Sequence, residues 1–119
     1  MLGQRPISLM EAFVEESLIA SGTADSPAID LREIAQNWRF SAHYIITGTG
    51  TIKIEYLICS TKDGTYLNIG TDIGATLGAG SSILPFASDE PVLAPWMKIR
   101  VTEDGGVNPA VVSVNINVQ

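Results

Sequence analysis

The stretch WRFSAHYIITGTGTIKIEYLICS, which runs from Trp38 to Ser60, decides the fold. Apolar residues take alternate positions on both sides of its glycine-rich centre: Phe40, Ala42, Tyr44 and Ile46 before it, and Ile52, Ile54, Tyr56 and Ile58 after it. A period of two residues places one face of a β-strand in a core and the other in water. We therefore predict a β-hairpin in the interior of an antiparallel sheet, with residues 47–50 (TGTG) as its turn.

Turn signals and further alternation extend this pattern over the chain. Pro85 predicts an edge strand over residues 83–86, because proline has no N–H to donate. Residues 70–82 are rich in Gly, Ala, Thr and Ser, which predicts a mobile loop. The other expected elements are strands over 16–23, 28–31, around 66–68, 97–101 and 112–118, and a single helical turn over 31–36. The predicted fold class is all-β: an antiparallel β-sandwich, jelly-roll or immunoglobulin-like, of seven to eight short strands.

One domain accounts for the length of 119 residues. We expect an N-terminal arm over residues 1–15 and a single β-sandwich domain over residues 16–119, although residues 7–20 also fit the spacing of a helix. A sandwich complete from residue 16 leaves the apolar side chains of the arm without a core, so we expect another chain to cover them. Deleting residues 1–14 should then leave the domain folded. The candidates for contact with a partner are Ile7, Leu9, Met10, Phe13 and Val14 in the arm and Leu77 in the predicted loop.

The charge balance restricts the classes of partner. The formal net charge is −6, and the seven Lys and Arg residues are scattered along the chain, whereas nucleic-acid binding needs them clustered on one face. We expect no nucleic-acid partner. No apolar run approaches the roughly 20 residues that cross a bilayer, and the N-terminus lacks a signal-peptide pattern, so we expect no membrane partner and no export by the ordinary secretory route. A charged fraction of only 17% favours contacts with other chains.

The residue types that carry catalysis or bind metals are sparse. His43 is the only histidine and has the parity of an outward face, and the single cysteine, Cys59, lies in an apolar strand and is expected to be a buried, unreactive thiol. Residues 74–80 lack the Lys-Ser/Thr of a phosphate-binding loop. The carboxylates of predicted turns lack the spacing of a calcium loop: Asp63, Asp72, Asp89, Glu90 and Asp104. We assign no catalytic, cofactor-binding or metal-binding residues and expect no enzyme activity and no cofactor.

The two tryptophans leave one alternative open. Trp38 and Trp96 each begin a predicted strand, and we expect both to be core aromatics. Rings exposed on a face of the sandwich would instead favour stacking on sugars. The protein would then be a carbohydrate-binding module.

Four segments carry a resemblance to a known group of proteins. They are residues 19–31 (IASGTADSPAIDL), 47–56 (TGTGTIKIEY), 60–65 (STKDGT) and 95–103 (PWMKIRVTE). In this order they resemble segments of small β-sandwich proteins encoded among the virion genes of tailed phages and prophages. The resemblance extends over about residues 19–118. The chain departs from that pattern at Cys59, at an insertion over residues 31–37, and at Tyr66, where a tryptophan often follows the Asp-Gly turn.

The resemblance implies a function without chemistry. Proteins of this kind are similar to head decoration, cement or tail accessory components, and they carry no catalytic residues that transfer to this chain. It implies further copies of the chain and a major capsid or tail protein as partners. It also implies a location in the virion, and in the host cytoplasm before assembly.

Overall fold

A computed structural model describes residues 7–35, 39–86 and 94–119 of the chain. This described part contains nine strands and no α-helix. The strands are β1 (Ser8–Leu18), β2 (Thr23–Asp25), β3 (Ile29–Asp30), β4 (Phe40–Gly48), β5 (Ile52–Cys59), β6 (Leu67–Leu77), β7 (Gly80–Pro85), β8 (Trp96–Glu103) and β9 (Ala110–Val118). No helix of these residues is therefore long and apolar enough to cross a membrane.

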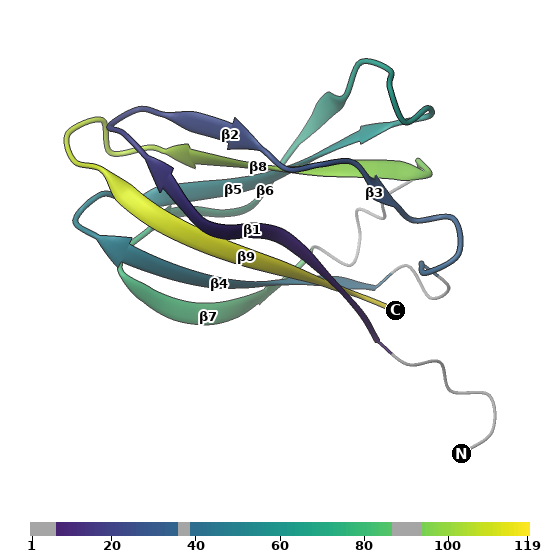
Figure 1. The fold of residues 1–119 in the computed structure, drawn as a ribbon, viewed down its shortest axis with the longest axis horizontal. Coiled ribbons are helices and arrows are strands. Elements are labelled where there is room, and N and C mark those ends of the chain that lie inside the picture. Colours follow the sequence, from purple (N-terminus) through teal and green to yellow (C-terminus); the bar gives the residue numbers. More distant parts are fainter. Residues whose placement is uncertain (1–6, 36–38, 87–93) are drawn as a thin grey trace.

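The strands form two antiparallel sheets that pack face to face (Figure 1). The first sheet has the order β1-β9-β4-β7 and is the lower layer in Figure 1. The second sheet has the order β2-β8-β5-β6, and β3 also pairs with β8, so β2 and β3 are two parts of one edge strand. Two four-strand layers between which the chain passes repeatedly are the arrangement of a jelly roll. The predicted β-sandwich is confirmed, with nine strands among the described residues instead of seven to eight.

The predicted hairpin between β4 and β5 is wrong, because the two strands lie in different sheets. Alternation shows that each strand has one buried face, but it does not show whether two strands share a sheet. Residues 49–51 carry the chain from the first sheet to the second. Gly48 has a φ of 98°, and a Cβ at Gly50 would lie 2.4 Å from the carbonyl oxygen of Asn108. Both strands are interior strands, as predicted: β4 lies between β9 and β7, and β5 between β8 and β6.

The predicted loop over residues 70–82 is also wrong, because these residues belong mainly to β6 and β7. β6 pairs with β5 across three register shifts, and the turn between them contains the bond from Gly64 N–H to the Thr61 carbonyl (3.4 Å). Among the described strands, β5 and β6 are the consecutive pair that forms a hairpin. Small side chains gave residues 70–82 the composition of a loop without breaking their strand conformation. Pro85 ends β7 at the edge of the first sheet, as predicted.

The N-terminal strand begins at Ser8, eight residues before the predicted start at Glu16. The predicted boundary between arm and domain therefore falls inside β1. Register shifts on both sides of Phe13 interrupt the alternation, and Glu15 has a positive φ of 49°. Because the bulges change which residues face the core, the apolar residues of this segment depart from a period of two and can be mistaken for a helical pattern. Phe13 is only 7% exposed, so deleting residues 1–14 would remove part of the core, contrary to the expectation from sequence.

Inward side chains of both sheets form one core, in which β8 and β9 contribute every second residue. Phe86 stacks on Phe40 and on Tyr56, with ring centroids 5.3 and 5.0 Å apart. This aromatic stack joins the two layers near the end of β7.

Replacing Ile54 by Asp should lower the free energy of unfolding by at least about 3 kcal/mol, because it places an unpaired charge in the core. Ile54 is fully buried in β5. Ile45→Asp is the matched control on β4, where the side chain is 49% exposed, and it should cost about 1 kcal/mol or less. Urea denaturation measures both. Equal losses for the two variants would contradict the register.

Candidate interaction surfaces

The structure divides the six predicted partner-contact residues into two groups. Three side chains are exposed on or beside β1: Ile7 (64%), Leu9 (57%) and Val14 (66%). The other three pack on or within the core: Met10, Phe13 and Leu77. Only the first group is available to a partner, because the second group already has a core to fill.

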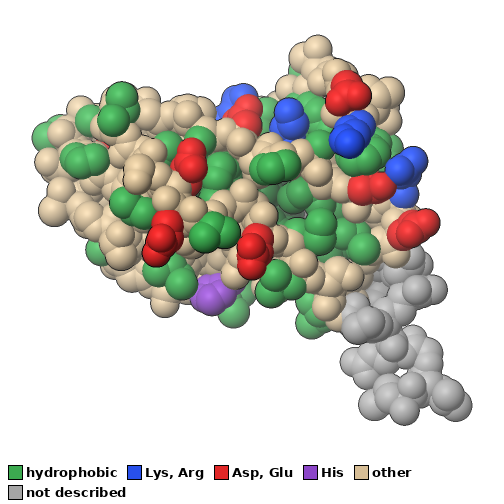
Figure 2. All heavy atoms as spheres, viewed as in Figure 1, with side chains coloured by type: hydrophobic (Ala, Val, Ile, Leu, Met, Phe, Trp, Pro, Cys, Tyr) green, Lys and Arg blue, Asp and Glu red, His purple; other side chains and the backbone are tan. Residues whose placement is uncertain are grey.

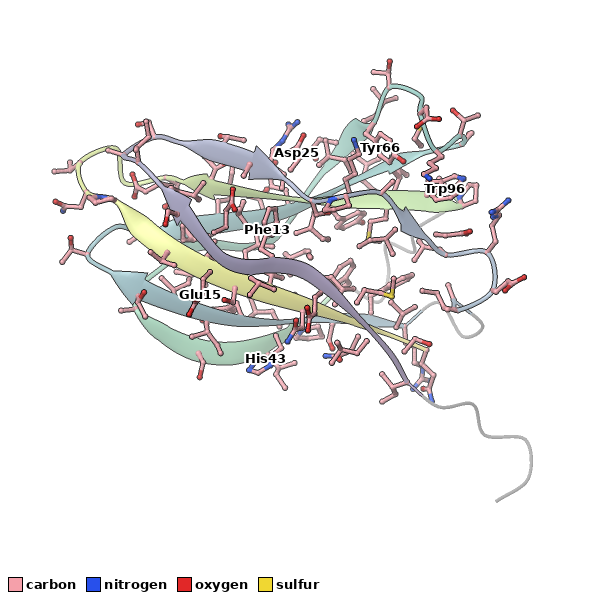
Figure 3. All side chains as sticks on the ribbon, viewed as in Figure 1. Phe13, Glu15, Asp25, His43, Tyr66 and Trp96 are labelled. Atoms are coloured by element: carbon pink, nitrogen blue, oxygen red, sulfur yellow. The ribbon has the colours of Figure 1, made fainter. Side chains whose placement is uncertain are left out.

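The outer face of the first sheet is poor in charge. Its four strands contain no Lys or Arg, and the outward positions of β4 and β9 carry small polar and apolar side chains. Ile45 and Ile83 are 49% and 59% exposed there. His43 points outward, as predicted, and lies opposite Asn115 and Ile83 in the strand register (Figure 3).

The carboxylates of the first sheet are concentrated on its β1 edge. Glu11 and Glu15 are exposed and Glu16 is half-buried. The ion pairs found among the described residues include none of the three. Near the bulge, the Glu15 N–H donates to Ser113 Oγ (2.9 Å), which ties β1 to the outer side of β9. The β1 edge therefore combines negative charge with the exposed apolar side chains of Leu9 and Val14.

The outer face of the second sheet carries an aromatic-basic cluster, defined here as Trp96, Tyr66, Arg32, Lys62 and Lys98. The Arg32 guanidinium lies 5.0 Å and the Lys62 Nζ 6.0 Å from the centre of the Trp96 ring. The Lys98 Nζ lies 4.6 Å from the centre of the Tyr66 ring. The Tyr66 hydroxyl donates to the Lys62 carbonyl (2.7 Å), which fixes the turn between β5 and β6 against this ring.

Trp96 is half-buried on this outer face, so its prediction as a core aromatic is wrong. It lies between Asp30 of β3 and Cys59 of β5 in the strand register. Cys59 is half-buried as well, with Sγ 3.8 Å from Thr61 Oγ1, and is not the buried thiol that we predicted. Trp38 lies outside the described residues.

The basic residues are not scattered in space, contrary to the sequence expectation. Figure 2 shows Lys and Arg side chains gathered on the side of the second sheet. Five of the seven basic residues of the chain are on its strands or the adjoining turns: Arg32, Lys53, Lys62, Lys98 and Arg100. Their grouping follows from outward positions on β5 and β8 and from two connections that meet at the same end.

Three of these five cations form ion pairs within the chain. Arg32 donates through Nε and Nη2 to Asp30 (2.9 and 2.7 Å), and this hydrogen bonding lowers the pKa of Asp30 to about 2. Arg100 pairs likewise with Asp25 (2.7 and 3.0 Å) and lowers its pKa. Lys53 lies 3.7 Å from Glu55. Lys62 and Lys98 take part in no ion pair found among the described residues.

A buried carboxylate, Glu103, joins three connections at the opposite end of the sandwich. It is 1% exposed and accepts hydrogen bonds from the backbone N–H groups of Thr51 (2.9 Å), Ser21 (3.1 Å), Gly105 (2.9 Å) and Gly106 (2.7 Å). The Thr51 and Ser21 bonds, supported by those of the two glycines, outweigh burial and lower the pKa of Glu103 to about 2. The sequence feature that could have identified Glu103 as buried is its inward parity, which it shares with Met97, Ile99 and Val101.

Asp104 adds the end of β6 to this network. Its Oδ1 accepts from Thr51 Oγ1 (2.6 Å), and its Oδ2 accepts from the Thr76 N–H (2.7 Å) and Oγ1 (3.2 Å). Burial raises the pKa of Asp104, but these hydrogen bonds lower it by more. Both carboxylates are thus occupied by donors of the chain itself. The described residues contain no group of three or more His, Cys, Asp or Glu side chains placed to hold a metal ion.

No protein-family model and no curated protein matches the sequence. Among solved structures, one similar chain belongs to the structure of infectious bursal disease virus Gx strain. It has a TM-score of 0.46 and 12% sequence identity, and the match covers 95% of this chain and 32% of that chain. The present chain therefore spans about a third of that chain's length. A likeness at this level assigns neither a family nor a function.

Acid should destabilise the fold through Glu103. Its folded pKa of about 2 lies below the ordinary value of 4.5, so its contribution is complete above pH 4.5 and is lost as the pH falls towards 2. Glu103→Gln should be less stable at neutral pH and should lose less stability between these limits. Urea denaturation at a series of pH values measures the slope. Glu11→Gln, on the exposed β1 edge, is the control and should keep the wild-type slope.

Proposed function

We propose that the chain is a non-enzymatic structural component of a phage particle, a capsid decoration, cement or tail accessory protein that acts through protein–protein contacts. Its partners would be further copies of itself and a major capsid or tail protein. It would be located in the virion, and in the host cytoplasm before assembly. The resemblance of residues 19–31 and 47–56 to virion-associated proteins supports this proposal.

The single observation that carries the proposal is the surface formed by the first sheet and its β1 edge. This surface contains no Lys or Arg in its strands, and Lys is depleted at protein interfaces. Four apolar side chains on it are between 49% and 66% exposed: Leu9, Val14, Ile45 and Ile83. Such a surface has more to gain from a protein partner than from water.

The fold is compatible with this role but does not determine it. Jelly rolls occur in viral capsid domains and in lectins, and one fold supports unrelated functions. The assignment therefore depends on the surface, which offers exposed apolar side chains beside the carboxylates of β1. The carboxylates of Glu103 and Asp104 are occupied by the chain's own donors instead.

A carbohydrate-binding module is the second candidate, and the half-exposed aromatics Trp96 and Tyr66 favour it. Sugars stack on the face of an aromatic ring. In this structure Arg32 already lies over the Trp96 ring, and Lys98 over the Tyr66 ring. Because these cations compete with a sugar for the ring faces, we place the structural role through protein–protein contacts ahead of carbohydrate binding.

Substituting the exposed β1 residues should abolish incorporation into particles without unfolding the protein. The test uses host cells that assemble phage particles from a genome without the gene for this protein, while the protein is supplied in trans. Mass spectrometry of the purified particles should then detect the wild-type protein. The Leu9→Asp, Val14→Asp double variant should be absent from them. Its free energy of unfolding should fall by only about 1–2 kcal/mol, because both side chains are largely exposed.

Val107→Asp is the matched control, because Val107 is 78% exposed and lies in the connection between β8 and β9, outside the four strands of the first sheet. It should be incorporated like wild type. Absence of the wild-type protein from purified particles would contradict the proposed function. Incorporation of the β1 double variant would contradict the assigned surface.

A further inference from the structure

The strands of the first sheet carry three carboxylates outside the ion pairs, and the outer face of the second sheet carries two ammonium groups outside them. The carboxylates are Glu11, Glu15 and Glu16 on the β1 edge of the first sheet. The ammonium groups are Lys62 and Lys98 in the aromatic-basic cluster of the second sheet. None of the five is in an ion pair found among the described residues. Figure 3 shows Glu15 on the lower side of the sandwich and Tyr66 and Trp96 on the upper side.

The two groups do not meet within one copy of the chain. The β1 edge belongs to the first sheet, the cluster covers the outer face of the second, and the common core lies between the layers. A salt bridge requires the nitrogen and oxygen atoms to approach within about 4 Å. Only a second molecule can bring the two sets of charges together.

The two surfaces also match in their apolar parts. On the β1 edge, Leu9 and Val14 lie beside the carboxylates and are 57% and 66% exposed. In the cluster, the ammonium groups lie over the rings of Tyr66 and Trp96, and Leu67 next to Tyr66 is 63% exposed. Each surface therefore offers apolar side chains together with charge, and the charges are opposite in sign. Complementary charge steers association and sets its register.

We propose that a second copy of this chain docks its β1 edge on the aromatic-basic cluster of the first. The carboxylates of Glu11, Glu15 and Glu16 would pair with Lys62 and Lys98, and Leu9 and Val14 would pack on Leu67 and on the edges of the aromatic rings. Because two different surfaces meet, the contact is head to tail and produces a closed ring or an open filament. The biological role of this contact rests on the proposed function. The contact itself is tested with purified protein, so the contact and the proposed function can fail independently.

Charge reversal on each surface provides the test. One variant combines Lys62→Glu with Lys98→Glu, and the other combines Glu11→Lys with Glu15→Lys. Sedimentation equilibrium should show that the wild type associates at low ionic strength, and that about 0.5 M salt weakens the association, because salt screens charges. Each variant alone should associate at least about tenfold more weakly, a loss of about 1.4 kcal/mol.

Mixing the two variants should restore association, because each then offers the other an oppositely charged surface. Asp72→Lys, an exposed position of β6 outside both surfaces, controls for net charge and should associate like wild type. Circular dichroism confirms the fold of each variant. If a reversed variant is unfolded, the neutral pairs Lys62→Gln with Lys98→Gln and Glu11→Gln with Glu15→Gln replace it, and each should weaken association.

Three results would overturn the proposal. The first is a wild-type protein that stays monomeric up to about 1 mM at low salt, the weak limit of specific association. The second is association that survives reversal of either surface. The third is a mixture of the two reversed variants that stays monomeric although each variant is folded. Association that requires an added acidic saccharide or acidic peptide would assign the cluster to that ligand and would also overturn docking by a second copy.

Discussion

The hydrogen bonds to Glu103 are the interaction on which the rest of the structure depends. A jelly roll has few hairpins, so the position of one layer on the other depends on the connections that cross between them. Three such connections, β1 to β2, β4 to β5 and β8 to β9, donate backbone N–H groups to this one carboxylate. A buried charge is costly unless it is fully hydrogen-bonded, and here four donors satisfy it. Asp104 extends the network to the end of β6 through Thr76.

This arrangement gives the two ends of the sandwich different properties. At the Glu103 end, the polar groups of the connections are used to hold the fold, and few of them are left for a partner. At the other end, the turn after β3 and the turn between β5 and β6 place Arg32 and Lys62 beside Trp96. Cationic and aromatic side chains are thus exposed at this end on the outer face of the second sheet. The hydrogen-bonded carboxylates and the aromatic-basic cluster thus lie at opposite ends of the sandwich.

The sequence correctly predicted the strands that have strong apolar alternation. It predicted less well the strand pairing and the strands whose alternation is interrupted. The regular patterns of β4, β5, β8 and β9 placed these strands and their buried faces correctly. The pattern did not reveal that residues 49–51 cross between sheets, because a strand buries one face in the same way in either layer. Bulges on both sides of Phe13 disguised β1, and small side chains disguised β6 and β7.

The candidate surfaces were predictable only in part, for a related reason. Exposure of Leu9 and Val14 followed from their place in the N-terminal segment, but burial of Phe13 depends on a register shift that composition does not encode. The aromatic-basic cluster joins residues from the chain positions 32, 62, 66, 96 and 98, and only the register of β3, β5 and β8 brings them together. Glu103 carried a local signal, since it continues the inward parity of β8.

The edges of both sheets are irregular, and this has a consequence for the behaviour of the protein at high concentration. β1 is bulged twice, β7 ends in Pro85, the strand formed by β2 and β3 is interrupted at Pro27, and β6 shifts register three times against β5. A straight open edge is the template on which cross-β fibrils grow, and three of these four edges are bulged or interrupted, while the regular edge of β7 is short and ends in proline. The sandwich is thereby protected from amyloid-like polymerisation. Irregular edges of this kind favour contacts between copies through side chains over extension of a sheet.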